Sequence, residues 1–191
     1  MLADLAIPEA RLETRFDREP ISDGQWTERG IDAVEFFFSA NPGEAVRPLA
    51  KVASGGELSR VMLSLKSLAT TDRFGKTLVF DEIDAGIGGA VADRVGAMLR
   101  ELSGEFQIIC VTHLPQIAAY ASSHHHVSKV VQKGRTVTRI EELAEEAQVT
   151  ELARLMTGAD SAGARAGARE MLVSKEKTKG ESERRKAKPG D

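Results

Sequence analysis

The sequence predicts an α/β fold with a parallel-sheet core, helices on both faces of that sheet and antiparallel strands at its edge. Two strongly apolar segments, 77–81 and 107–112, are each typical of a buried strand. An amphipathic helix pattern over about 90–102 separates them, and such a strand–helix–strand unit places its strands parallel in one sheet. The chain has 191 residues, which is enough for one domain with a hydrophobic core.

The antiparallel pair is predicted from the first third of the chain. Residues 10–19 alternate between apolar and charged side chains, as a half-exposed strand does. Residues 31–38 alternate in the same way, and Asp23-Gly24 marks a turn between the two segments. Asn41-Pro42-Gly43 ends the second segment, so we expect a hairpin at the edge of the domain.

A helix is expected to begin at Ser54. Ser54 with Glu57 three residues later forms a capping box, and apolar residues then recur at three- and four-residue steps. The predicted apolar stripe consists of Leu58, Val61, Met62, Leu65, Leu68 and Ala69. The remaining expected elements are a short helix near 115–121, strands near 126–132 and 135–140 around a Lys133-Gly134 turn, and helices near 141–157 and 161–173.

The charge distribution divides the chain into a folded lobe, residues 1–174, and a tail, residues 175–191. Net charge is −3 for the whole chain, but the tail carries seven Lys/Arg and four Asp/Glu. The tail has no large apolar residue, so we expect it to be disordered. Two functions stay open for it: a solubilising end, or weak contact with a phosphate backbone.

The composition favours a cytoplasmic protein without a membrane segment. No apolar run approaches the roughly 20 residues that cross a bilayer, and the N-terminus lacks the features of a signal peptide. The single cysteine, Cys110, agrees with a reducing compartment and lies in an apolar run, so we expect a small core residue. The run His124–His126 alternates sides on a strand and therefore does not point to a metal site.

Polar side chains follow both predicted parallel strands. Asp81 and Glu82 end the first strand, and His113 follows the second. Ligands of α/β proteins bind at the carboxyl ends of parallel strands. There Asp81 is suited to hold Mg²⁺, Glu82 to polarise an attacking water, and His113 to donate to a phosphate oxygen. The alternative is that the two acids are simply solvated and that the histidine is a structural hydrogen-bonding group.

The segment Ser54-Gly55-Gly56 is a candidate anion site. Free amide N–H groups and the positive end of the helix dipole favour a phosphate at a helix start, and two glycines allow its close approach. The alternative is an ordinary capped helix. Gly75-Lys76-Thr77 resembles the end of a P-loop, but it follows a helix pattern and precedes a strand, which is the reverse of the P-loop order. No other P-loop sequence occurs in the chain.

Together these motifs resemble the heads of ABC-type ATPases within the P-loop NTPases. Ser54-Gly55-Gly56-Glu57 is similar to the signature motif, Leu78–Glu82 to Walker B, Asp84 to the D-loop aspartate and His113 to the switch histidine. The wider segments 51–60, 80–89 and 111–118, with 36–48, resemble the bacterial RecN family of DNA repair proteins, which are relatives of the SMC proteins. The resemblance covers roughly residues 1–173.

The resemblance implies that the chain is the C-terminal lobe of an ATPase head. In this family an N-terminal lobe of the same protein carries Walker A, and two heads form a homodimer with ATP between them. Asp81 would then position Mg²⁺, Glu82 would activate water and His113 would sense the γ-phosphate. The signature residues, Ser54 to Glu57, would close on the partner head's ATP, and Asp84 would lie at the dimer seam.

The resemblance also implies a function in ATP-dependent double-strand-break repair and recombination, with DNA as a partner of the full-length protein and a location at the nucleoid. We expect the isolated chain to be inactive as an ATPase, because it has no phosphate-cradling loop. A non-catalytic interaction module is the second hypothesis, and the presence of Asp81, Glu82 and His113 disfavours it. A transporter ATPase is the third, and Ala53 and Glu57 in the signature disfavour it.

Overall fold

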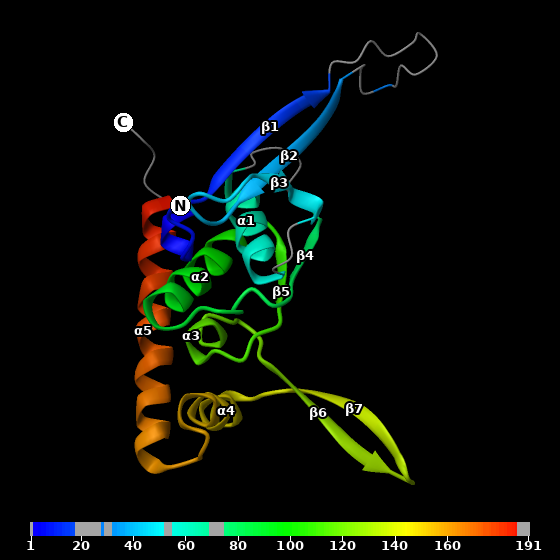
Figure 1. Cartoon of the computed structure of the whole chain (residues 1–191). Helices are drawn as coiled ribbons and strands as arrows, with labels where there is room; N and C mark the ends of the chain where they lie inside the picture. Colours follow the sequence, from blue (N-terminus) through cyan, green and yellow to red (C-terminus); the bar gives the residue numbers. More distant parts are fainter. Residues whose placement is uncertain (1, 18–27, 29–31, 52–54, 69–74, 187–191) are drawn as a thin grey trace.

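A computed structural model describes residues 2–17, 28, 32–51, 55–68 and 75–186; for residues 33 and 176–186 it describes the backbone alone. Figure 1 shows a helical body from which two β-hairpins project. The elements are η1 (Ala3–Leu5), β1 (Arg11–Asp17), β2 (Ala33–Ser39), β3 (Arg47–Pro48), η3 (Leu49–Lys51), α1 (Gly55–Leu68), β4 (Thr77–Phe80), α2 (Gly89–Leu102), β5 (Gln107–Cys110), α3 (Pro115–Ala118), β6 (His125–Gln132), β7 (Arg135–Glu142), α4 (Glu145–Thr157) and α5 (Ala162–Lys186).

The predicted parallel pair is confirmed. Strands β4 and β5 pair in parallel, with Thr77 opposite Gln107 and Phe80 opposite Cys110, and α2 forms the connection between them. The Val111 amide also donates to the Phe80 carbonyl at 2.9 Å, so the ladder extends one step past β5. The Lys76-Thr77 segment leads directly into β4, as the sequence predicts.

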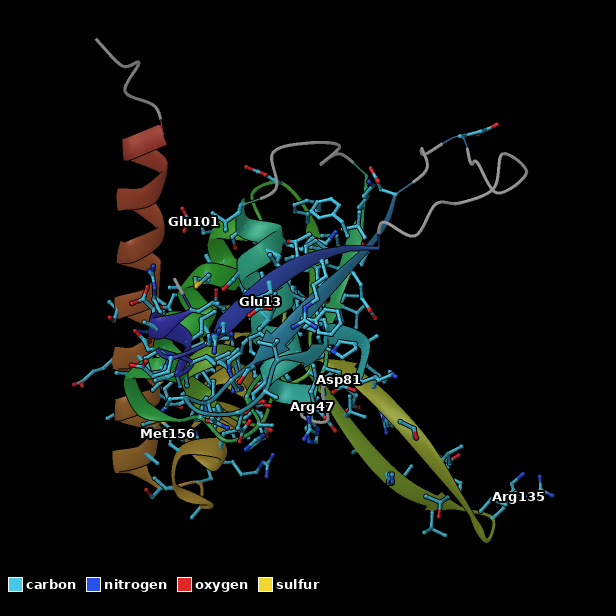
Figure 2. The ribbon with its side chains drawn as sticks, turned by 45° about the horizontal axis from the view of Figure 1, so that its top comes forward. Glu13, Arg47, Asp81, Glu101, Arg135 and Met156 are labelled. Atoms are coloured by element: carbon cyan, nitrogen blue, oxygen red, sulfur yellow. The ribbon has the colours of Figure 1, made fainter. Side chains whose placement is uncertain are left out.

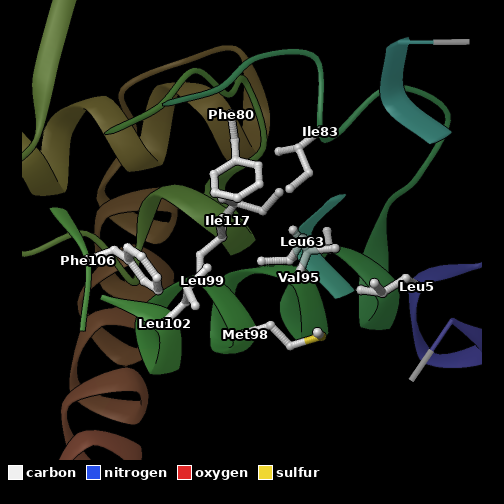
Figure 3. Close-up of a cluster of buried hydrophobic side chains, with 11 residues drawn as sticks. Leu5, Leu63, Phe80, Ile83, Val95, Met98, Leu99, Leu102, Phe106 and Ile117 are labelled. Carbon is white, nitrogen blue, oxygen red and sulfur yellow. The ribbon is translucent and has the colours of Figure 1, made fainter. Parts of the chain in front are cut away.

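One face of this parallel pair packs against the largest hydrophobic core. Phe80 lies there with Leu63 of α1 and with Val95 and Leu99 of α2, all at most 6% exposed (Figure 3). Burying a side chain of this size contributes roughly 1.5–3 kcal/mol, so this cluster holds the strand ends in place. The opposite face bears Val79, Ile109 and Val111, which are 65%, 48% and 56% exposed. Within the described residues, helices therefore cover one face of β4–β5.

Helix α1 differs from its predicted apolar stripe. Leu63 is fully buried although it lies outside the stripe, whereas Met62 and Leu68 are 37% and 65% exposed. The helix contacts two separate cores, because Leu63 packs in the main core and Val61 packs with Phe38 in another. A sequence pattern with one apolar face does not describe a helix that packs against two hydrophobic cores.

The expected N-terminal hairpin is confirmed as an antiparallel pair. Strands β1 and β2 pair from Arg11 opposite Ser39 to Asp17 opposite Ala33, and β3 adds a short third strand. Phe38 is buried at the base of the hairpin, but Phe16, Val34 and Phe36 farther out are 54%, 51% and 45% exposed. The outer half of the hairpin thus presents apolar side chains to solvent.

The second hairpin is also confirmed, with Lys133 and Gly134 at its turn. Both residues have positive φ angles, 50° and 74°, as a tight hairpin turn of this kind requires. Strand β7 continues to Glu142, so the helix expected from residue 141 begins instead at Glu145. The hairpin points away from the helical body in Figure 1.

The last helix extends into the segment that the sequence analysis expects to be a disordered tail. Helix α5 runs without interruption from Ala162 to Lys186, and Figure 1 shows it alongside α2, α3 and α4. Lys175 anchors it: its ammonium pairs with Asp93 of α2 and lies 4.9 Å from the centroid of the Tyr120 ring. Lys, Glu and Arg have high helix propensity, so a low-hydropathy segment continues a helix that is already nucleated.

Residues 187–191 lie outside the described residues. Among those described, no helix has both the length and the apolarity that a membrane span requires.

Candidate active site

The predicted site residues converge because two parallel strands end side by side. Asp81 follows β4 directly, and His113 follows shortly after β5. Adjacent parallel strands deliver their C-terminal residues to the same edge of a sheet. Figure 2 labels Asp81 at this edge. The loop 81–85 is thus the centre of the candidate site.

Asp81 offers a carboxylate that fits the predicted Mg²⁺. The residue is exposed, one of its oxygens, Oδ1, accepts the Glu82 amide at 2.9 Å, and its backbone carbonyl accepts the Ser59 hydroxyl at 2.9 Å. A carboxylate with its backbone fixed at an open edge is suited to a hard cation that keeps most of its water shell. The described residues contain no group of three or more His, Cys, Asp or Glu that could hold a metal by themselves.

Glu82 has a strained backbone conformation. Its φ is 55°, in the left-handed region, which costs a non-glycine residue roughly 1–2 kcal/mol. Strain of this kind concentrates at functional sites, where the surrounding structure enforces it. Its carboxylate lies beside the start of α1: a Cβ added to Gly55 would sit 2.3 Å from Glu82 Oε2.

Gly56 of α1 is needed for this close packing. A Cβ at Gly56 would lie 2.8 Å from the Ala85 side chain and 2.9 Å from the Glu82 carbonyl oxygen. Gly56 is buried and Glu57 half-buried in the first turn of the helix. Ser54 lies outside the described residues. The start of α1 and the loop 81–85 therefore form one packed unit within this chain.

Arg60 ties α1 to the same loop. Its Nη1 donates to the carbonyls of Ile83 and Ala85, at 3.3 and 2.9 Å, and the residue is only 5% exposed. Burial lowers the pKa of this guanidinium, and the nearby Glu57 charge opposes that shift. A guanidinium remains charged even so, because its ordinary pKa is above 12.

Asp84 is buried and links the two strand ends. Its carboxylate oxygen Oδ2 accepts the Thr112 hydroxyl at 2.6 Å and the His113 amide at 2.8 Å, and it lies 2.9 Å from His113 Nδ1. The side chain of Asp84 is 6% exposed, whereas that of His113 is 74% exposed. The Thr112 hydroxyl in turn accepts the Leu114 amide at 3.1 Å.

Sequence reasoning missed Arg60, Thr112 and Ser59 as parts of this site. Arg60 could have been found, because it is a charged residue within an apolar helix pattern and a buried charge needs partners. Thr112 and Ser59 gave no comparable signal, because their hydrogen bonds depend on the distance between separate elements.

Cys110 lies behind the site as a partly buried thiol. Burial and, to a smaller extent, the negative charges of Asp84 and Asp81 raise the pKa of this thiol to about 12. The thiolate is therefore not formed at neutral pH, which agrees with the expected core residue.

The fold defines the structural class of this chain: it is similar to the head domains of SMC proteins. The Smc head domain from Pyrococcus yayanosii, solved with a coiled coil and joint, is 23% identical to the chain with a TM-score of 0.50. The match covers 82% of this chain and 27% of that one, and it shows the shared fold. No protein-family model matches the chain.

The particular family follows from curated relatives. DNA repair protein RecN of Bacillus subtilis is 41% identical over 78% of the chain, that of Deinococcus radiodurans 43% over 91%, and that of Mycobacterium tuberculosis 52% over 75%. The chain belongs to the RecN family. It spans 27%, 30% and 25% of the length of these three relatives, so it corresponds to one part of such a protein.

Proposed function

We propose that this chain is the C-terminal lobe of an ATP-hydrolysing head in a RecN-type protein that acts in DNA double-strand-break repair and recombination. The observation that carries the proposal is the meeting of the glycine-rich start of α1, the acid pair after β4 and the histidine after β5 around loop 81–85. The relatives in the RecN family, which are named DNA repair proteins, support the biological context.

Each residue of the site has a proposed task. Asp81 holds Mg²⁺, which would neutralise charge on the phosphates of ATP when both are bound. Glu82 orients and polarises the attacking water, and His113 donates to the γ-phosphate or that water. Gly55 and Gly56 start a helix whose amides suit a phosphate, with Glu57 in its first turn. Ser54, which lies outside the described residues, is proposed to bind the same phosphate.

The phosphate cradle is proposed to come from an N-terminal lobe of the same protein. The 191 residues contain no P-loop sequence, and a second lobe would explain why Val79, Ile109 and Val111 form an exposed apolar face on β4–β5. The start of α1 would then face ATP held by a second head, so the active form is a homodimer with nucleotide between the heads. DNA contact belongs to the full-length protein, in the cytoplasm at the nucleoid.

The test compares ATP hydrolysis by the 191-residue chain alone with hydrolysis by the chain combined with the N-terminal lobe. We expect no appreciable turnover from the chain alone and turnover from the combination. Glu82→Gln should abolish that turnover and trap an ATP-bound dimer, measured by size-exclusion chromatography with light scattering. Robust turnover by the chain alone that Glu82→Gln abolishes contradicts the two-lobe site, and a dimer that forms equally well without ATP contradicts the sandwich.

A further inference from the structure

The contacts of Asp84 point to a function inside its own chain. A buried carboxylate is costly unless hydrogen bonds compensate for its lost hydration. Here two donors, the Thr112 hydroxyl and the His113 amide, reach Oδ2 at 2.6 and 2.8 Å. Both belong to the segment after β5, so the carboxylate fastens the histidine-bearing segment to the loop after β4.

The same oxygen also determines the state of the His113 ring. Its distance to Nδ1 is 2.9 Å, and an ionised carboxylate only accepts hydrogen bonds. The nitrogen that faces it must therefore carry the proton, which leaves Nε2 as the second ring nitrogen available to a ligand. Because the His113 side chain is 74% exposed, this contact is a principal restraint on the orientation of the ring.

We infer that Asp84 is a positioning residue, which holds His113 in the Nδ1–H tautomer and aims Nε2 at the nucleotide site. The inference rests on the proposed function, since it concerns the same histidine. It assigns Asp84 a place within the chain, in contrast to the dimer seam expected from the resemblance. With a side chain only 6% exposed, Asp84 has little surface to offer a second head.

The first test is spectroscopic and uses the 191-residue chain labelled with ¹⁵N-histidine. The chain has four histidines, and the His113→Gln spectrum identifies the His113 ring signals. We expect long-range ¹H–¹⁵N spectra at a pH where the ring is neutral to show the Nδ1–H tautomer in the wild type. Asp84→Asn should lose that preference, whereas Asp93→Asn, which alters a carboxylate of α2 outside the site, should keep it.

The second test is kinetic and uses the full two-lobe protein. We expect Asp84→Asn to lower kcat roughly 10- to 100-fold with little change in KM for ATP, as loss of an orienting hydrogen-bond partner does. His113→Ala should lower kcat as well, and the double variant should be no slower than the slower single variant, because the two residues act as a unit. Asp93→Asn should turn over ATP at the wild-type rate.

The outcomes separate this inference from the proposed function. An Nε2–H tautomer in the wild type overturns the inference, and this result does not depend on any variant folding. If Asp84→Asn alters the tautomer but hydrolyses ATP at the wild-type rate, the inference is overturned and the proposed function is not. Wild-type turnover by His113→Ala overturns the proposed function of His113 and the inference together, whatever the spectra show.

Discussion

At the scale of single residues, the two glycines that begin α1 have different neighbours, so their substitution by alanine should have different effects on stability. A methyl group at Gly55 meets the end of the Glu82 side chain, which can rotate away, so Gly55→Ala should keep stability within about 1 kcal/mol. A methyl group at Gly56 meets the Glu82 carbonyl at 2.9 Å and Ala85, which are not free to move, so Gly56→Ala should lose roughly 1–3 kcal/mol.

Urea unfolding of both variants measures this difference, and ATP turnover of the two-lobe protein shows whether displacing the Glu82 carboxylate matters. We expect Gly55→Ala to lose turnover while it keeps its midpoint of unfolding. Equal destabilisation by the two substitutions would show that the packing of α1 on loop 81–85 is described wrongly.

The Cys110 thiol should be unreactive in the folded chain. Its pKa is raised to about 12, so at pH 8 a thiol reagent should modify it much more slowly than it modifies the same chain in denaturant. The unfolded thiol ionises near pH 8.5, so unfolding releases this proton between that value and 12. The contribution of Cys110 to stability is therefore present below about pH 8.5 and falls as pH rises above it.

The rate of reaction with a thiol reagent measures the reactivity of Cys110, and the Cys110→Ser variant serves as the blank. The dependence of stability on pH is measured for the wild type and for Cys110→Ser, which serves as the control. Rapid modification of the native chain at pH 8 would contradict the raised pKa. A pH dependence above 8.5 that is unchanged in Cys110→Ser would assign the effect to another group.

The candidate site residues were predictable from the sequence, whereas the contacts between them were not. Asp81, Glu82 and His113 follow apolar strands, which is a local pattern, and the structure places them at one edge. The burial of Asp84 and its contact with His113 depend on where β5 ends relative to β4, which no spacing in the sequence encodes. The left-handed backbone of Glu82, which lies beside Gly55 and Gly56, likewise has no signal in the sequence.

At the scale of elements, helix α5 packs in a buried cluster with α4 and also forms an ion pair with α2, between Lys175 and Asp93. The Lys175 side chain is 14% exposed and that of Asp93 is 41% exposed, so solvent screens the pair only in part. We expect the coupling between them to be about 1 kcal/mol, at the upper end for an exposed pair and below that of a buried one.

A double-mutant cycle with Lys175→Met and Asp93→Asn, followed by urea unfolding, measures this coupling. Methionine keeps much of the lysine stem and its packing on Tyr120, so the cycle isolates the charge. Arg165→Met, on the same helix but paired with Asp160, is a matched control that should not couple to Asp93. A coupling near zero would mean that packing and not the ion pair holds α5 in place.

Element boundaries were predicted best where turn residues mark them. The Lys133-Gly134 turn and the strands β6 and β7 follow their predicted positions closely. Helix α5 continues over residues 175–186, where the low hydropathy of the sequence favoured disorder. An isolated segment of that composition does not form a stable helix, but one continuous with a docked helix pays no nucleation cost.

At the scale of the whole molecule, the predicted class of fold is confirmed, yet the sheet is covered on one face within the described residues. Apolar strands without alternation indicated burial on both faces, and this chain supplies helices for one. The uncovered face agrees with the proposed second lobe, and the chain spans 25–30% of the length of its relatives.

The exposed apolar face of β4–β5 is where the proposed N-terminal lobe should bind. Val79 and Ile109 are 65% and 48% exposed, so changing each to lysine should alter the stability of the chain by less than about 0.5 kcal/mol. Co-purification with the N-terminal lobe should be lost in both variants, because a buried, unpaired ammonium is costly at an interface. Val173→Lys on α5, a position that is 50% exposed, is the matched control and should leave co-purification unchanged.

If Val79→Lys and Ile109→Lys bind the lobe as the wild type does, the two lobes meet elsewhere and the two-lobe site must be placed differently. If all three variants fail to bind, added positive charge is the cause and the face is not identified.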